Sequence, residues 1–570
     1  MKLLGVPGTL DLSGGNNYGL DLKGFGSTAG SNQVVIVDGM RLNDDDLAGV
    51  NLGSIPITAV QRIEVLRGAG AVQYGSGATG GVIVITTYAG KGVQRKNALV
   101  LSAEVGSLGL VDERANAVLA AGNFSFDVAA QDQRTSGSRA NFASENSNLS
   151  ASGQWSNDWL RIGFKGGNSA LHSGWPGSLT QAQFQADQTL ASTASDWGTM
   201  ATTNGAVFAE ATFADWTVNF DSAQRSKLVK SKDASSDTYG TAADQTLGAR
   251  NVQSFGNVAN AFAIGLSHSQ WVSDALPSYV ESMANTQGWF LNDDVTLPTQ
   301  TRLSAGVRNE NEQKNVAAPA SNAYATPGLP LSNNLTAWQL GVNQTVAQAW
   351  NVYARAGQSY RLANMDEMTY TSTTTPLLPQ VAQDQEMGVR WDSAADHAEL
   401  RWFHSDIANE IALDPVSYTN INLANTVHQG VELSTRHALG KMVDLRLNVA
   451  AHDAHFASGT YAGKQLALVP GQTASVGVDV RPAAGQLVNL GLNWVSDQKA
   501  TFANTCAIPA YTTLDTRYAY TMRNWELSAA VKNLTDERYY TLAYGCSGGL
   551  PSSIYPEARR TFSVAARVSF

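Results

Sequence analysis

The feature that most constrains this fold is a two-residue alternation of apolar and polar side chains, which recurs from about residue 98 to the C-terminus. The last ten residues show it most clearly. One face of that segment carries Phe562, Val564, Ala566, Val568 and Phe570, and the other carries Thr561, Ser563, Ala565, Arg567 and Ser569. Successive side chains of a β-strand point to opposite faces, so the pattern predicts strands with one apolar and one polar face. Such strands build a membrane β-barrel or a soluble sandwich, and the alternation alone does not separate the two.

Composition favours the membrane barrel. The chain has no run of 18 apolar residues and its mean hydropathy is −0.17, which excludes transmembrane helices. Charged residues make up 15% of the chain, against roughly 25% in soluble domains, which is typical of strands with one face in lipid. A large soluble all-β protein is the alternative. The net charge of −10 and the lack of a Lys- or Arg-rich run argue against a nucleic-acid partner.

Residues 34–87 predict a small sheet. Three strand-like runs, Val34–Val37, Ile63–Leu66 and Val82–Ile85, are joined by turns rich in Gly and Asp. Residues 24–29 and 75–80 each match the glycine fingerprint of dinucleotide-binding proteins, but strand-like runs follow them where that fingerprint requires a helix. The glycines therefore predict tight turns and close backbone approach, and we expect no nucleotide cofactor.

No motif in the chain predicts an enzyme or a metal site. The G-x-S-x-G match at Gly545–Gly549 lies in a Gly- and Pro-rich segment rather than between a strand and a helix. His452 and His455 are three residues apart on an alternating strand, so they point to opposite faces and cannot form a simple metal-binding pair. We expect no catalytic residue, no metal and no cofactor.

Several segments resemble, in the same order, those of the TonB-dependent receptors of the bacterial outer membrane. The matching segments are Asp38-Gly39, Ile55-Pro56, Arg62–Gly68, Tyr74–Thr86, Tyr353–Arg361, Gln385–Arg390, Asn422–Glu432, Asn533–Tyr540 and Tyr555–Phe562. The resemblance covers nearly the whole chain. It implies a membrane all-β protein, namely a 22-stranded antiparallel transmembrane β-barrel with a small N-terminal α/β plug domain inside its lumen. We expect the plug at residues 1–90, incomplete at its N-terminus, a linker at 91–97 and the barrel at 98–570.

By the same resemblance, short connections such as Thr521–Asn524 face the periplasm and longer polar ones are extracellular. The longer ones are expected near residues 226–257, 309–334, 496–511 and 533–557. Cys506 and Cys546 then fall in the last two extracellular loops, where an oxidising exterior permits a disulfide between them. Two unpaired buried thiols are the alternative. Phe570, the terminal aromatic residue, resembles the outer-membrane assembly signal of such barrels.

The resemblance places the candidate ligand contacts on two plug loops that face the outside. They are Asn16, Asn17, Tyr18, Asn43, Asp44, Asp45 and Leu47. Residues 44–46 are three adjacent carboxylates that lack the alternate spacing of a calcium-binding loop, so we expect a solvated acidic turn. Arg62, Glu64 and Arg67 resemble buried plug charges that face partners on the barrel wall, either as static salt bridges or as part of a switch.

The function that the resemblance implies is TonB-dependent active transport of a scarce large solute, a ferric siderophore or cobalamin, across the outer membrane. Its expected partners are the TonB–ExbB–ExbD complex, the ligand and outer-membrane lipid, and we expect a monomer. Residues 1–11 contain a proline and an aspartate before any apolar stretch of signal-peptide length, and the family's TonB box and first plug strand have no counterpart. The alternatives are a truncated, non-transporting fragment or a passive surface receptor for phage or toxins.

Overall fold

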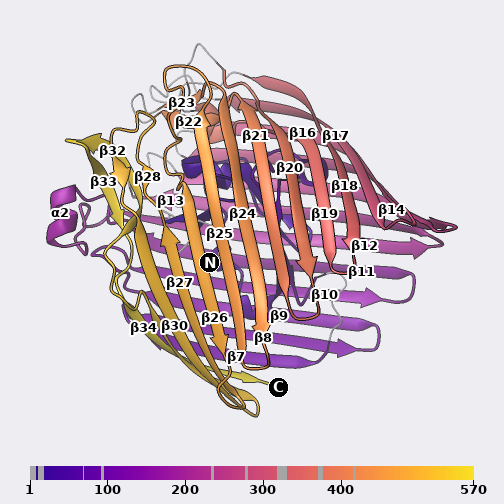
Figure 1. Ribbon diagram of the computed structural model, residues 1–570, viewed down its shortest axis with the longest axis horizontal. Coiled ribbons are helices and arrows are strands. Elements are labelled where there is room, and N and C mark those ends of the chain that lie inside the picture. The colour runs from indigo at the N-terminus through magenta and orange to yellow at the C-terminus, as the bar shows by residue number, and fades with distance from the viewer. Residues whose placement is uncertain are drawn as a thin grey trace.

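The computed structural model describes residues 8–10, 18–68, 70–90, 96–232, 237–276, 280–317, 330–369, 371, 376–414 and 419–570. Within these ranges, 22 antiparallel strands form a closed barrel, and a separate four-stranded sheet belongs to the N-terminal region (Figure 1). The expected fold class, a 22-stranded barrel with a plug, is confirmed. No helix in these ranges is long and apolar enough to cross a membrane.

Each barrel strand is hydrogen-bonded to its neighbours in a continuous ring, in which the last strand, β34, pairs with the first, β7. In chain order the barrel strands are β7 (Ala98–Gly106), β8 (Leu110–Ala121), β9 (Phe124–Thr135), β10 (Ser144–Ser156), β11 (Leu160–Gly174), β12 (Trp197–Phe213), β13 (Trp216–Ser231), β14 (Asp237–Phe255), β15 (Val258–Leu276), β16 (Val280–Thr296), β17 (Thr301–Ala317), β18 (Leu331–Ala347), β19 (Trp350–Arg361), β20 (Gln380–Asp392), β21 (His397–Ala408), β24 (Thr426–Leu439), β25 (Val443–Phe456), β26 (Gln472–Val480), β27 (Gln486–Val495), β30 (Tyr511–Met522), β31 (Trp525–Lys532) and β34 (Thr561–Ser569).

The barrel has unlike ends. At one end, the inner end, tight turns such as 122–123 and 523–524 join the strands. At the other, the outer end, most connections are longer and several carry elements of their own. These elements are α2 (Gln181–Ala186), α3 (Met365–Thr369), and the hairpins β22 (Ile411–Asp414) with β23 (Thr419–Asn422), β28 (Gln498–Lys499) with β29 (Ala507–Ile508), and β32 (Tyr540–Ser547) with β33 (Leu550–Pro556).

One of the four predicted long loops is wrong, and the centre of another lies outside the described residues. Strands β13 and β14 occupy most of residues 226–257 and leave 232–236 as their outer connection. Strands β17 and β18 likewise extend into 309–334, of which 318–329 lie outside the described residues. These strands look like loops in the sequence because their lumen-facing side chains are charged or polar. The other two predicted loops, 496–511 and 533–557, do fall in outer connections.

The two faces of the barrel wall settle the choice between membrane barrel and soluble sandwich. Phe562 and Val564 on β34 face outward with 53% and 55% of their surface exposed. On β17 the inward residues Arg308, Glu310 and Glu312 are at most 6% exposed. A soluble sandwich buries its apolar face, whereas here the apolar face is outside and the charged face is buried. That arrangement suits a wall with lipid around it.

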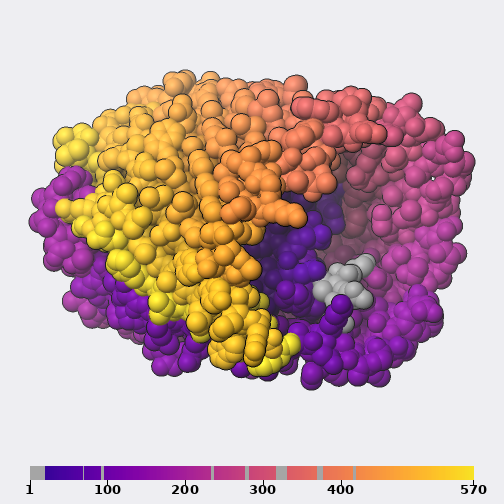
Figure 2. All heavy atoms as spheres, turned by 60° about the horizontal axis from the view of Figure 1, so that its bottom comes forward, coloured from indigo at the N-terminus to yellow at the C-terminus, as the bar shows by residue number. Residues whose placement is uncertain are grey.

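The plug fills the lumen and is visible in indigo inside the barrel (Figure 2). Its sheet has the order β4-β3-β6-β5, with β3 and β6 parallel. Around a core of Val34, Val82, Ile83 and Ile85, each 0% exposed, the described part of the plug has turns, three short 3-10 helices (η1 to η3) and one short α-helix. The plug elements are β1 (Gly8–Leu10), β2 (Tyr18–Leu20), η1 (Gly26–Asn32), β3 (Gln33–Val37), β4 (Met40–Arg41), η2 (Leu52–Ser54), η3 (Ile57–Ala59), β5 (Val60–Arg67), α1 (Ala71–Tyr74) and β6 (Gly81–Thr87). Residues 91–95 are outside the described ranges, so the predicted boundaries at 90 and 97 stay a prediction.

One glycine shows how closely the plug approaches the wall. Gly75, which follows α1, has a φ of +75°, and a Cβ placed on it would lie 2.6 Å from Oε2 of Glu310 and 3.2 Å from Nε of Arg308. Any side chain there would meet a buried ion pair of the wall as well as a strained backbone. The fingerprint-like glycines thus serve close packing, as the sequence predicts for this segment.

Candidate functional site

The acidic turn of the plug is bound to the barrel wall near its outer end. Nζ of Lys227 on β13 lies 2.7 Å from Oδ2 of Asp44 and 2.6 Å from Oδ2 of Asp46. The guanidinium of Arg225, also on β13, donates to Oδ1 of Asp44, with Nε at 3.1 Å. The prediction of a solvated acidic turn is wrong, because the Asp44 and Asp46 side chains are only 5% and 6% exposed. Each carboxylate has exchanged water for a wall cation.

The remaining predicted contacts of this loop have different surroundings. Nζ of Lys314 on β17 lies 2.6 Å from Oδ1 of Asp45, so this carboxylate is also paired. The Asn43 side chain accepts from the Val35 backbone and donates to the Gln33 carbonyl, which fixes the loop to β3. Leu47 is 53% exposed.

Leu47 is also connected to the outer end of the wall through its backbone. Its N–H donates to Oδ2 of Asp366 on α3 at 2.8 Å. The other predicted plug loop is largely outside the description: Asn16 and Asn17 are not among the described residues, and Tyr18 begins β2 without a described side chain. Among the predicted ligand contacts whose side chains are described, Leu47 is thus the exposed one, and the others are hydrogen-bonded or ion-paired within the protein.

The acidic turn contains two carboxylates of opposite protonation behaviour. Burial raises the pKa of Asp46 to about 7, with Lys227 opposing the shift and Asp44 and Asp366 adding to it. Burial acts on Asp44 as well, but Arg225 and Lys227 together outweigh it and hold the pKa of that carboxyl below its ordinary value. Asp44 therefore stays ionised, whereas Asp46 titrates near neutral pH.

A second plug–wall contact was not predicted. Nζ of Lys23 lies 2.5 Å from Oδ1 of Asp384 on β20, and both side chains are less than a tenth exposed. Ser359 and Ser405 donate to the same carboxylate. Asp21 accepts from the backbone N–H groups of residues 23–26 and so shapes the turn that presents Lys23. A lysine in a glycine-rich turn gives no sequence signal for a wall partner 361 residues away.

A third contact lies where β5 ends. Arg67 is paired with Glu432 on β24, and Arg401 bridges Glu432 and Glu386 at 2.9 Å each. The backbone carbonyl of Arg67 accepts from Arg355, which also pairs with Glu386. Two wall cations and two wall carboxylates thus surround one plug arginine, a network that leaves few charges unpaired in a buried setting.

The structure separates the other two predicted plug charges from this network. Arg62 and Glu64 lie on β5 and pair with each other at 3.0 Å, with side chains 61% and 41% exposed. Of the three residues, Arg67 is the one that the structure pairs with the wall, through Glu432. Exposed pairs of this kind contribute little to stability, so any role of Arg62 and Glu64 lies at the surface of the plug.

A cavity of about 220 Å³ lies between the plug and wall strands β11 to β17. Its lining is mixed: Arg41 and Tyr74 from the plug and Asp244, His268 and Trp271 from the barrel lie beside apolar side chains such as Phe290. Figure 2 shows a hollow beside the indigo plug on the side of the magenta to pink strands. The cavity adjoins the acidic-turn contact, because Asp44, Asp45 and Arg225 are among its lining residues.

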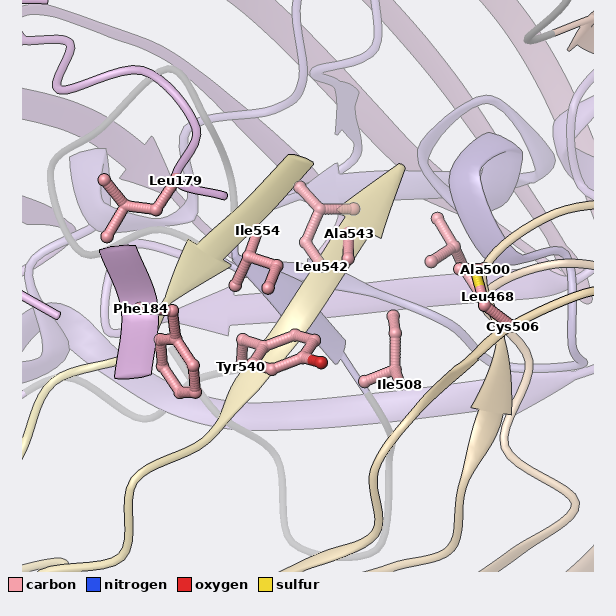
Figure 3. Packing of buried hydrophobic residues seen from close by; sticks show 10 residues of the cluster. All are labelled: Leu179, Phe184, Leu468, Ala500, Cys506, Ile508, Tyr540, Leu542, Ala543 and Ile554. Atoms are coloured by element: carbon pink, nitrogen blue, oxygen red, sulfur yellow. The ribbon is translucent and has the colours of Figure 1, made fainter. Parts of the chain in front are cut away.

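The outer connections carry a hydrophobic cluster and a disulfide. Phe184 of α2 packs edge-on against Tyr540, with ring centroids 5.1 Å apart, and both belong to a cluster with Leu179, Ile508 and Ile554 (Figure 3). The structure joins Cys506 to Cys546, which are 40 residues apart with Cα atoms at 5.9 Å. The bond ties the connection after β27 to the one after β31, and so holds the outer cluster together.

Comparison with known proteins agrees with this architecture. Residues 111–534 match the family described as TonB dependent receptor-like, beta-barrel, and residues 3–82 match the TonB-dependent receptor plug domain. The chain is 23% identical over 300 residues to the probable TonB-dependent siderophore receptor PiuA of Acinetobacter baumannii, a match that spans 47% of this chain and 39% of that protein. It is 22% identical over 564 residues to the vitamin B12 transporter BtuB of Photobacterium profundum, which covers 94% of this chain and 85% of that protein.

The fold is also that of solved structures. The ferric citrate transporter FecA in its unliganded form superposes with a TM-score of 0.87 at 19% identity, over 100% of this chain and 93% of that one. Since the barrel match alone spans well over half of the sequence, the chain belongs to the TonB-dependent receptors and is a β-barrel protein of the outer membrane.

Proposed function

We propose that this protein takes up a ferric siderophore or cobalamin in a step driven by the TonB–ExbB–ExbD complex. The observation that carries the proposal is a plug held in the lumen of a closed barrel by buried ion pairs to strands β13, β17, β20 and β24. A large solute cannot pass while the plug keeps this position. Uptake therefore requires work on the plug, which an energised partner supplies.

The three plug–wall contacts differ in what breaks them, either ligand binding at the outer end or a pull from the periplasm. Breaking a buried ion pair leaves an unpaired charge and costs about 3–5 kcal/mol. The acidic turn and Lys23 sit near the outer end, where a ligand arrives, and Arg67 of β5 lies deeper in the lumen, paired with Glu432 on β24. Ligand binding at the outer end weakens the first contacts, and the pull from the periplasm breaks the rest.

Two further expectations belong to this proposal. The outward side chains of the wall contact outer-membrane lipid, in keeping with the exposed Phe562 and Val564. The protein acts as a monomer, because β34 pairs with β7 and the closed ring leaves no strand edge for a second copy.

The test compares uptake by cells that carry the natural gene, cells that lack it, and cells that lack TonB. Radiolabelled iron is supplied in several siderophores, and labelled cobalamin is supplied in parallel. We expect one ligand whose accumulation needs both the gene and TonB. Accumulation that persists without TonB would refute energy-coupled uptake, and binding without accumulation would favour the passive receptor.

A further inference from the structure

We propose that the ligand of this receptor carries no net negative charge. The inference rests on the uptake function proposed above and narrows its substrate class to uncharged or cationic metal complexes. Its basis is the distribution of positive charge over the outer end of the barrel and the upper lumen, where a ligand first meets the protein.

The outer connections are acidic. The eleven segments that join barrel strands at the outer end contain seven Lys and Arg residues and eleven Asp and Glu residues. The parts of these segments that the structure leaves undescribed, 233–236, 277–279, 318–329, 370, 372–375 and 415–418, contain no Lys or Arg in the sequence. A surface with this balance repels polyanions and lowers their rate of encounter.

The seven outer cations are engaged by partners within the outer connections, several of them in a neighbouring connection. Arg139 donates to the carbonyls of Gly177 and Leu190, and Arg538 donates to Gln188 and to the end of α2. The remaining five also have partners within the outer connections: Lys232 with Asp196, Lys464 with the Ala503 carbonyl, Lys499 with Asp497, Arg559 with Asp536, and Arg560 with the Leu534 carbonyl. Their charge serves to fold the loops rather than to meet an anion.

Among the described residues, several cations of the upper lumen are paired with carboxylates, and Arg41 and Lys165 beside the cavity donate to backbone carbonyls of the plug. The plug turn 44–46 occupies Arg225, Lys227 and Lys314, as described above. Lys23 is bound to Asp384, and Arg361 to Glu367 at 2.8 Å. A polyanionic chelate would have to displace a buried carboxylate at one of these sites. At these sites it would replace a charge-assisted hydrogen bond that the protein already makes rather than add a new one.

What the outer end offers instead is apolar and uncharged surface. Leu47 on the plug loop is 53% exposed, and Leu378 and Leu413 in the outer connections are 52% and 44% exposed. Contacts of this kind suit a ligand whose metal charge is balanced within the complex. A ligand with ionised groups at its periphery would bind less well to this surface, because those groups would lose water without gaining a cation of the protein as a partner.

The experiment titrates the full chain in detergent with metal complexes of different charge, two of which share ferric iron. The probes are an uncharged ferric trihydroxamate, electroneutral cyanocobalamin and a trianionic ferric tris-catecholate, followed by tryptophan fluorescence with an inner-filter control. We expect an uncharged complex to bind about 100-fold more tightly than the trianion, with an affinity that does not change with salt. Equal or tighter binding of the trianion, weakening as salt rises, would overturn the charge inference and leave the uptake function standing. Binding of none would count against both.

Matched variants separate charge from fold. Asp196→Asn and Asp497→Asn together release Lys232 and Lys499 at the outer end and should tighten binding of the trianion by about fourfold at 0.15 M salt, as two charges about 10 Å away act through a screened field. The control is Asp479→Asn near the inner end, which releases Arg446. It should change neither the affinity for the trianion nor the affinity for the uncharged complex. An equal effect of both changes would show that the outer charges do not select the ligand.

Discussion

Removal of one carboxylate from the acidic turn should loosen the outer half of the plug. In Asp44→Ala the guanidinium of Arg225 loses its carboxylate and keeps only the Arg41 carbonyl as a plug partner, while Lys227 retains Asp46. The Arg225 side chain is 6% exposed, so it becomes an unpaired buried cation. Breaking such a pair costs about 3–5 kcal/mol, which lowers the free energy that holds this loop to the wall by the same amount.

Amide hydrogen exchange of the detergent-purified protein measures this change. Each 1.4 kcal/mol corresponds to a tenfold factor, so exchange of residues 42–52 should accelerate by about 100- to 1,000-fold or more, up to the rate set by release of the whole plug. The amides of β20 and β24 should keep their protection, because their ion pairs with Lys23 and Arg67 are intact.

Two variants make the result decisive. Asp132→Ala removes the partner of Arg134 from a pair whose side chains are 44% and 62% exposed, so it should change no exchange rate by more than a few-fold. Arg225→Ala in the Asp44→Ala background removes the unpaired charge and should restore part of the protection. An acceleration below tenfold in the single variant, or no recovery in the double variant, would refute the conclusion that the Asp44–Arg225 ion pair holds this loop to the wall.

Three other outcomes are expected. Replacing Cys506 and Cys546 with serine should cost the outer cluster about 4 kcal/mol for a 40-residue loop, seen as faster proteolysis of outer connections while the barrel keeps its heat-resistant mobility in gels. Because the folded-state pKa of Asp46 is raised to about 7, the docked loop should lose stability as the pH rises from about 4 through 7, and Asp46→Asn should abolish that slope in proteolysis at each pH. Phe570→Ala should reduce the folded fraction in membranes, with the change Phe562→Ala on the same face as its control.

The alternation of apolar and polar residues predicted those strands whose two faces meet the same surroundings along their length. Strand β34 is an example in its first half, since Phe562 and Val564 are 53% and 55% exposed and alternate with half-buried Ser563 and Ala565. The same rule failed at β13, where Arg225 and Lys227 stand on a lumen face that the plug covers. Charged side chains normally indicate exposure to water, and the sequence does not reveal that a carboxylate will replace that water.

The ion-pair partners of the plug could not be predicted from the sequence, because they lie far from it along the chain. Asp44 meets Arg225 across 181 residues, and the chain offers 38 Lys and Arg residues from which a partner could come. A solvated turn is the default for three adjacent carboxylates when no cation lies near them in sequence. Arg67 was placed at the wall through resemblance, whereas Arg62 and Glu64, two residues apart on one strand face, satisfy each other instead.

The seam between β7 and β34 has a consequence for how the protein is made. Ser563 on the last strand pairs with Gly106 on the first, so the ring closes only when the two ends of a chain region of more than 450 residues meet. Ring closure therefore cannot begin during synthesis, and the loop-closure entropy for this pair is the largest in the barrel. Until β34 pairs with it, β7 has an edge of unpaired backbone N–H and C=O groups, which can pair with another chain and cause aggregation. The polypeptide must therefore reach the membrane with its ring open, and the pairing of β34 with β7 completes the barrel.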